Sequence, residues 1–122
     1  MGIGIDIVEI DKIGRLIERW EYKFLNRVFT DRELVEWEAR GKRLSLLAGK
    51  FATKEAFFKA NKNNTENKRV DAGLLTRIRW KEIEVVGVPF EPPSIWVRGQ
   101  KIDTDLSISH TSQIAVSVVL IK

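Results

Sequence analysis

The first twenty residues combine two hydrophobic periods. Residues 3–10 follow a period of two, which predicts a β-strand with three isoleucines on one face and Asp6, beside Gly4, on the other. After this strand the apolar side chains recur every three or four positions, which predicts a helix over residues 11–20 with Asp11 as its N-cap. The chain therefore opens with a strand that passes directly into an amphipathic helix.

Further helices are expected up to residue 61. Residues 22–29 are largely apolar and predict a short helical turn. Thr30 and Glu33 form the capping box T-D-R-E, which predicts a helix that ends before Gly41. A longer helix is predicted over residues 42–61.

The second half of the chain has the pattern of antiparallel β-structure. The polar stretch 61–73 predicts a loop, and the alternating or apolar runs after it predict strands over residues 79–86, 94–97, 106–110 and 113–121. The last two form a hairpin around His110–Ser112. We therefore expect an α+β fold in which an antiparallel sheet packs with a long central helix, with residues 1–122 as a single domain.

Composition narrows the class of protein. The 122 residues are 43% hydrophobic and 31% charged, which is enough apolar material for one packed core. The net charge of +4 favours an anionic ligand or an acidic partner. Because the chain has no cysteine and one histidine, disulfides, thiolate metal sites and clusters of histidine ligands are excluded. The longest apolar tract, residues 114–121, is too short to span a membrane, and the sequence begins with no signal-peptide pattern, so we expect a cytoplasmic protein.

Glu55 interrupts the apolar face of the long helix. At about 100° per residue it lies about 40° from Phe51, inside the apolar arc, and Lys59 lies at about 80°. A carboxylate on a buried face needs a partner. Two interpretations remain open: a metal ligand or acid–base group, or an internal Glu55–Lys59 pair spaced i,i+4.

Asp6 and His110 are polar residues in β-structure. Asp6 is a functional carboxylate or a solvent-facing residue near a strand end, and Gly4 beside it allows a backbone or a ligand to approach closely. Asp6 and Glu55 together offer oxygen ligands for a hard cation such as Mg²⁺. His110 ends a strand at the turn of the last hairpin, where a structural and a catalytic role are both open.

A basic stripe lies on the first helix. Lys12, Arg15 and Arg19 recur at i, i+3 and i+7, which is typical of a solvated face and also suits docking of an acidic helix. Nucleic acid is not favoured as a partner, because the four tryptophans fall mostly on predicted apolar faces rather than among the basic residues.

Three segments together resemble the signature motifs of the holo-[acyl-carrier-protein] synthases, the small 4′-phosphopantetheinyl transferases. They are GIGIDIVEI (2–10), GKFATKEAFFKA (49–60) and LSISHTSQIAVSVVL (106–120), in the order of that family, and RWKEIEVVG (79–87), followed by Pro89, resembles a fourth and weaker segment. The resemblance implies transfer of the phosphopantetheine arm of coenzyme A to a serine of apo acyl carrier protein, a step in fatty acid biosynthesis that releases adenosine 3′,5′-bisphosphate.

The resemblance also implies roles for individual residues. Asp6 and Glu55 would hold Mg²⁺, and Lys59 would lie near the scissile pyrophosphate. The residues implied in coenzyme A binding are Lys50, which stands where the family often has Arg, together with Phe51, Lys59, Pro89, His110 and Thr111. The catalytic set is then Asp6, Glu55, Lys59 and His110.

An assembly and a docking surface are implied in the same way. The family forms homotrimers with each site shared between neighbouring subunits, so that Asp6 and His110 would face Glu55 and Lys59 across an interface. The helix with Lys12, Arg15 and Arg19 matches the family's carrier-docking helix. The chain departs from the family where NKNN (61–64) replaces a glycine-rich turn, and where GQKIDTD (99–105) replaces a helix.

Two other classes of function compete with the transferase. A non-catalytic module would bind acidic carrier-type proteins through the basic stripe. A small basic nucleic-acid binder would lose affinity steeply with salt and would need no Mg²⁺. The transferase is favoured because the unusual polar residues lie on apolar faces, where a catalytic site needs them and a docking surface does not.

Overall fold

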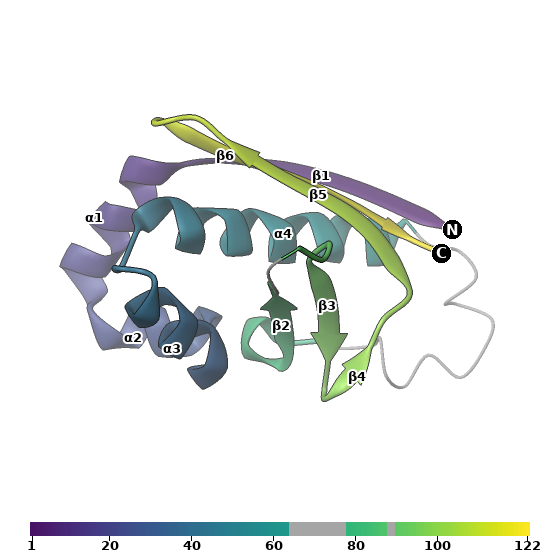
Figure 1. Cartoon of the computed structure of the whole chain (residues 1–122), viewed down its shortest axis with the longest axis horizontal. Coiled ribbons are helices and arrows are strands. Elements are labelled where there is room, and N and C mark those ends of the chain that lie inside the picture. The colour runs from purple at the N-terminus through teal and green to yellow at the C-terminus, as the bar shows by residue number, and fades with distance from the viewer. Residues whose placement is uncertain (64–77, 88–89) are drawn as a thin grey trace.

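The computed structural model describes residues 1–63, 78–87 and 90–122, and one long helix, α4, lies through its middle (Figure 1). Along the chain the elements are β1 (Gly2–Glu9), α1 (Ile10–Trp20), α2 (Tyr22–Val28), α3 (Asp31–Ala39), α4 (Leu44–Lys62), the 3₁₀ turn η3 (Trp80–Glu82), β2 (Ile83–Val86), β3 (Ser94–Val97), β4 (Gln100–Lys101), β5 (Thr104–His110) and β6 (Ile114–Ile121). The α+β class with a long central helix is confirmed.

The described strands form two antiparallel sheets on opposite sides of α4 (Figure 1). The larger sheet has the order β1-β6-β5, and the smaller one the order β2-β3-β4. In the larger sheet Asp6 pairs with Ser117, which in turn pairs with Ile108. Directly paired residues of antiparallel strands share a face, so these three side chains point to the same side of the sheet.

Small residues allow α4 to lie close against β1. A Cβ atom added to Gly4 would lie 2.0 Å from the Ala56 carbonyl oxygen. The helix meets the sheet with a row of alanines spaced four residues apart, which are Ala48, Ala52, Ala56 and Ala60, all fully buried. Of the two possibilities that the sequence left for Gly4, the close neighbour is thus the backbone of α4.

Two apolar clusters line α4. The first joins its N-terminal half to α1, α2 and α3, and contains Ile13, Phe29 and Leu47. The second joins its C-terminal half to the small sheet and β6, and contains Phe57, Ile95 and Val119. Because apolar elements surround α4, its buried residues are not confined to one stripe.

Most element predictions are confirmed, with three corrections. The N-cap of α1 is Glu9 and not Asp11, which lies in the first turn, because α1 continues directly from β1. Residues 80–82 form the 3₁₀ turn η3 instead of the first half of a strand. The short strand β4 was not predicted. The Thr30–Glu33 capping box is present, and Gly41 has φ +81° just after α3. Most of the predicted loop 61–73 lies outside the described residues.

Candidate active site

Asp6, Glu55 and Lys59 come together where β1 crosses α4. The Lys59 ammonium donates to Asp6 Oδ1 at 3.2 Å and to the Ile5 carbonyl oxygen at 3.0 Å. Asp6 is turned toward α4 by the pleat of β1, and its side chain is only 16% exposed, whereas that of Lys59 is 51% exposed. The group therefore combines one partly enclosed carboxylate with a lysine that solvent and ligands can reach.

Glu55 belongs electrostatically to this group. Partial burial raises the pKa of the Glu55 carboxyl above its usual value, and the nearby Asp6 carboxylate raises it further. Lys59 and Lys12 act in the opposite direction without cancelling the effect. The carboxylates of Asp6 and Glu55 thus lie close enough to repel each other, and the nearby Lys59 forms an ion pair with Asp6.

This arrangement bears on one open alternative and corrects one expectation. Lys59 forms its ion pair with Asp6 on β1, so the internal Glu55–Lys59 pair, one of the two interpretations left open for Glu55, is not the contact that satisfies the lysine. Asp6 also lies beside Glu55 and Lys59 within a single chain, so the expectation that Asp6 faces them across a subunit interface is wrong. The cause is the close packing of β1 on α4, which the Gly4 contact makes possible.

The donor set fits a hard divalent cation. Mg²⁺ binds proteins through one or two carboxylates and completes its shell with water and phosphate oxygens. Asp6 and Glu55 supply two such carboxylates, and the mutual repulsion that raises the pKa of Glu55 is what a bound cation relieves. Among the described residues no cluster of three or more His, Cys, Asp or Glu side chains forms an all-protein cage, and Mg²⁺ does not require one.

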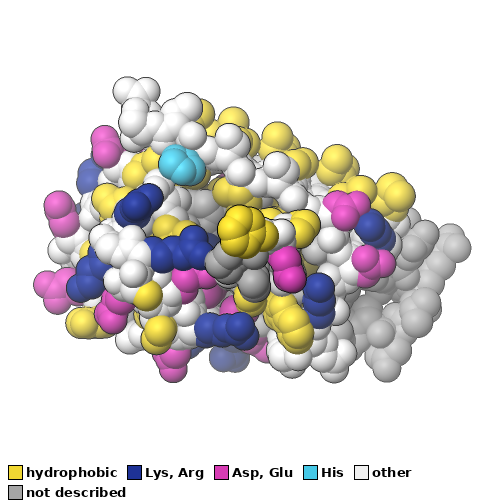
Figure 2. Space-filling view, in the orientation of Figure 1, with side chains coloured by type: hydrophobic (Ala, Val, Ile, Leu, Met, Phe, Trp, Pro, Cys, Tyr) yellow, Lys and Arg dark blue, Asp and Glu magenta, His cyan; other side chains and the backbone are white. Residues whose placement is uncertain are grey.

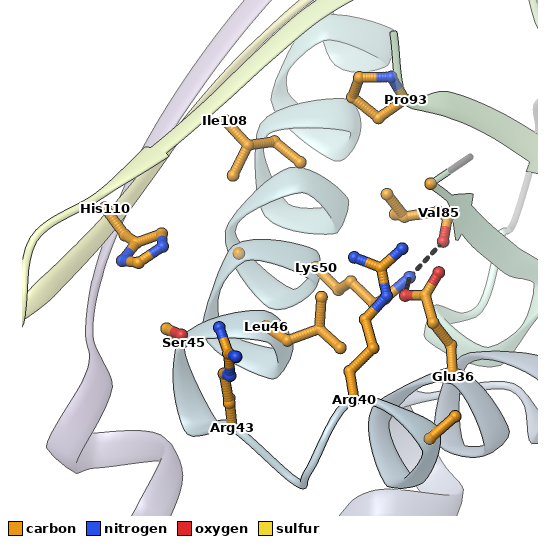
Figure 3. Close-up of a pocket in the computed structure, with 13 residues that line it drawn as sticks. Glu36, Arg40, Arg43, Ser45, Leu46, Lys50, Val85, Pro93, Ile108 and His110 are labelled. Atoms are coloured by element: carbon orange, nitrogen blue, oxygen red, sulfur yellow. Dashed lines mark hydrogen bonds and ion pairs between the residues drawn. The ribbon is translucent and has the colours of Figure 1, made fainter. Parts of the chain in front are cut away.

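A pocket of about 640 Å³ opens on the other side of α4, between α3, the ends of the small sheet and β5 (Figure 3). The charged or titratable residues among those that line it are Glu36, Arg40, Arg43, Lys50 and His110, and Ser45, Leu46, Gly49, Val85, Pro93 and Ile108 supply much of the remaining wall. It is lined by the N-terminal half of α4, from Ser45 to Lys50, so it meets the helix about one to three turns before Glu55. Three basic side chains against one carboxylate leave the lining net positive, which suits an anionic ligand.

The described residues predicted to bind coenzyme A do not all lie in this pocket. His110 lines the pocket, and its Nδ1 lies 3.2 Å from the Thr111 carbonyl oxygen. The Thr111 hydroxyl accepts from the Gln113 and Ile114 amides, which closes the β5–β6 hairpin. Phe51 stacks on Trp80 at 5.0 Å and belongs to an aromatic cluster. Pro89 lies outside the described residues, so its predicted role stays a prediction, and Pro93 is among the described residues that line the pocket.

Lys50 is buried rather than free in the pocket. Its side chain is 5% exposed, and its ammonium lies 2.8 Å from Glu36 Oε2 and donates to the Val85 carbonyl oxygen at 2.6 Å. Glu36 was not identified from the sequence. Its position three residues after Glu33 of the capping box was the available signal, since both face α4.

A second buried ion pair lies one turn further along α4. Lys54 donates to Glu33 Oε1 at 2.7 Å and to the carbonyl oxygens of Val28 and Trp80 at 2.6 and 3.1 Å, so all three ammonium protons have acceptors. Burial lowers the pKa of Lys54 even though Glu33 opposes the effect. Sequence reasoning missed this pair. On the helical wheel Lys54 lies about 60° from Phe51, at the edge of the apolar arc opposite to Glu55.

The predicted docking stripe lies on the exposed side of α1. Lys12, Arg15 and Arg19 are exposed, and the Arg19 guanidinium lies 5.2 Å from the centre of the Trp20 ring. A separate surface is apolar: Ile3, Ile5 and Ile7 on the outer face of β1 are 60%, 56% and 62% exposed, and hydrophobic side chains follow the outer edge of the large sheet in Figure 2.

Comparison with known proteins identifies relatives over the full length of the chain. The family model of the 4′-phosphopantetheinyl transferase superfamily matches residues 2–119. The chain is 35% identical to a holo-[acyl-carrier-protein] synthase of Chloroherpeton thalassium, covering all of this chain and 98% of that one. It is 36% identical to the synthase of Geobacillus kaustophilus, covering 100% and 88%.

Solved structures show the same fold. The synthase of Helicobacter pylori in complex with coenzyme A has a TM-score of 0.76 at 29% identity, covering 98% of this chain and 99% of that one. A Bacillus anthracis synthase in complex with coenzyme A (3′,5′-ADP) has a TM-score of 0.74 at 30% identity, covering 98% and 94%. Within the described part of the chain, no helix has the length and hydrophobicity needed to cross a membrane.

Proposed function

The chain belongs to the 4′-phosphopantetheinyl transferase superfamily, and we infer that it transfers the 4′-phosphopantetheine group of coenzyme A to a serine of apo acyl carrier protein. The products are holo acyl carrier protein and adenosine 3′,5′-bisphosphate. The observation that supports this function best is that Asp6, Glu55 and Lys59 lie together. Within the first two motifs, these are the residues to which the resemblance assigns metal binding and contact with the pyrophosphate.

Asp6 and Glu55 hold Mg²⁺ in this proposal. The ion, when bound, neutralises and polarises the pyrophosphate of coenzyme A. Lys59 neutralises the charge that develops on the leaving bisphosphate, and its 51% exposure leaves it accessible to that group. Asp6 orients Lys59 through the 3.2 Å contact, so one carboxylate serves both the cation and the lysine.

The cation-lined pocket accepts the bisphosphate end of coenzyme A. Arg40, Arg43 and Lys50 provide positive charge, and His110 stands on the β5 side of the cavity. His110 and Thr111 at the hairpin contact the nucleotide. Pro93, which lines the pocket just before β3, offers apolar contact for the nucleotide, in addition to the contact that the resemblance implies for Pro89.

The protein works as a homotrimer with sites at its subunit interfaces. The support within this chain is the outer face of the large sheet, where three isoleucines of β1 stand more than half exposed. On β6 their pairing partners are Leu120, Val118 and Val116, so the apolar surface continues across two strands. A second copy covering this face removes it from water, and the Asp6 group of one subunit can then complete the pocket of its neighbour.

The carrier protein docks on α1 through Lys12, Arg15 and Arg19. An acidic carrier is attracted by these exposed cations, which raises the rate of encounter and makes it sensitive to salt. We place the reaction in the cytoplasm, where it supplies holo carrier protein for fatty acid biosynthesis.

The direct test is intact-mass spectrometry of an apo acyl carrier protein after incubation with this protein, coenzyme A and Mg²⁺. We expect a gain of about 340 Da, the mass of one phosphopantetheine group, that EDTA prevents and excess Mg²⁺ restores. A matched reaction with Glu55→Gln should show no gain. If the carrier binds the protein but its mass never changes, with several carriers tried, the chain is a non-catalytic carrier-binding module.

A further inference from the structure

The pocket contains one carboxylate among its cations. Of the described residues that line the cavity, Arg40, Arg43 and Lys50 are positive, His110 is titratable, and Glu36 alone is acidic. A negative charge in a site for a polyanion opposes binding, because like charges at short range in a partly buried site repel strongly. Its presence therefore needs a reason.

Glu36 is ion-paired with the most deeply buried of these cations. Its Oε2 lies 2.8 Å from Lys50 Nζ, and the Glu36 side chain is 21% exposed compared with 5% for Lys50. The carboxylate is thus more accessible to solvent than the ammonium that it neutralises, and Figure 3 shows Arg40 extending toward this pair. A phosphate that enters the pocket therefore meets a Lys50 whose charge is already paired.

The backbone of β2 holds Lys50 in place independently of Glu36. Lys50 donates to the Val85 carbonyl oxygen at 2.6 Å, and the Val85 amide donates to Glu33 Oε2 at 2.9 Å. Lys50 therefore keeps a hydrogen-bond acceptor if the charge on residue 36 is removed. A glutamine at position 36 also retains a side-chain oxygen for the lysine.

We propose that Glu36 sets the affinity of the pocket for the anionic end of coenzyme A, by neutralising Lys50 and by repelling the phosphates. This inference rests on the proposed function, which identifies the ligand as a nucleotide bisphosphate. The carboxylate weakens the binding of substrate and of the bisphosphate product alike, and so favours release of that product after transfer.

Calorimetric titration with adenosine 3′,5′-bisphosphate tests this role. Glu36→Gln should bind the bisphosphate roughly three- to tenfold more tightly than the unchanged protein. Glu38→Gln is the matched control, because it removes the same charge from an exposed position of the same helix. It should leave the affinity unchanged. Adenosine, which carries no phosphate, should bind all three proteins equally.

Steady-state kinetics give a readout that a merely structural role would not produce. Glu36→Gln should lower the KM for coenzyme A and the inhibition constant of the bisphosphate by the same factor, and leave the KM for the carrier unchanged. Glu36→Ala, which removes the acceptor as well as the charge, should shift both constants in the same direction and provides a second test if the glutamine variant is unstable.

The outcomes separate this inference from the proposed function. Unchanged or weaker bisphosphate binding by both Glu36 variants, in a protein that still modifies the carrier, overturns the role of Glu36 and leaves the transferase intact. An equal gain in Glu38→Gln also overturns it, because the effect is then one of net charge. Absence of carrier modification by the unchanged protein rejects the proposed function itself.

Discussion

The ammonium of Lys59 lies 3.2 Å from the carboxylate of Asp6, although the two residues are 53 positions apart in the sequence. The contact exists because β1 lies directly on α4, with Gly4 against the backbone of Ala56 and Ala60. The same packing turns Asp6 inward beside Glu55. The candidate active site is thus a product of helix–sheet packing at the start of the chain.

Gly4→Ala should disrupt this packing. The new Cβ atom would lie 2.0 Å from the Ala56 carbonyl oxygen, a backbone atom that cannot rotate away. We expect a loss of about 3 kcal/mol or more in the free energy of unfolding, measured by urea denaturation, and a loss of transferase activity as Asp6 moves away from Glu55.

Gly14→Ala is the matched control for this substitution. Its Cβ atom would meet only Leu44 Cδ1, at 3.1 Å, which is the end of a flexible side chain, and alanine favours the helix by up to about 1 kcal/mol. The stability should change little or rise. Equal destabilisation by the two substitutions would contradict the importance of the β1–α4 contact.

Glu55→Gln should separate activity from folding. The substitution keeps the size of the side chain and removes the charge that we assign to metal binding, so carrier modification should fall about a hundredfold or more. The fold should persist, as shown by an unchanged circular dichroism spectrum. Glu18→Gln, which removes a charge from an exposed position of α1, serves as the control. A Glu55→Gln protein with the turnover of the unchanged chain would refute the assignment.

The raised pKa of Glu55 predicts that the difference in stability between the unchanged protein and Glu55→Gln depends on pH. A carboxyl whose pKa is higher in the folded than in the unfolded state stabilises the fold below the unfolded value of 4.5, and this contribution is lost as the pH rises through the folded value. In buffers without Mg²⁺, the unchanged protein and Glu55→Gln should therefore unfold at similar temperatures near pH 4. At pH 7 the glutamine variant should be the more stable. If the difference in unfolding temperature stayed constant across this pH range, burial and the Asp6 carboxylate would not raise the pKa of Glu55.

The sequence was sufficient for most of the elements, because they depend on local periodicity, although it missed the 3₁₀ turn η3 and the short strand β4. It predicted the strand of Asp6, the capping box at Thr30 and the hairpin that carries His110. It did not predict that Asp6 and Lys59 pair within one chain, since that depends on which face of β1 meets α4. Ile3, Ile5 and Ile7 would have favoured the opposite face on hydrophobicity alone.

The buried pairs were missed for a related reason. Lys50 and Lys54 look like solvent-facing lysines while α4 is assumed to have one apolar face. Their burial follows from α3 and β2, which cover that side of the helix and supply Glu33, Glu36 and the Val85 carbonyl. An ion pair between distant segments leaves no periodic signal in the sequence, so only the three-dimensional arrangement reveals it.

Lys54→Met should be strongly destabilising. It leaves the Glu33 carboxylate buried without its cation, and breaking a buried pair on one side typically costs about 3–5 kcal/mol. The free energy of unfolding from urea denaturation gives the measurement. Lys122→Met breaks the exposed pair with Asp105 and should change it by about 1 kcal/mol or less. The double variant Glu33→Gln, Lys54→Met should be more stable than Lys54→Met alone, and a further loss would contradict the charge-pair explanation.

Charge reversal on α1 tests the docking surface. Arg15→Glu with Arg19→Glu replaces two exposed cations by anions, so an acidic carrier should bind roughly tenfold or more weakly, seen as a higher KM for the carrier with an unchanged KM for coenzyme A. Salt should raise the carrier KM of the unchanged protein and have less effect on the variant. Lys81→Glu with Lys101→Glu makes the same change in net charge on η3 and β4, and should leave both constants unaltered. Equal damage to both substrates by the α1 variant would show that α1 supports the fold of the active site instead of docking the carrier.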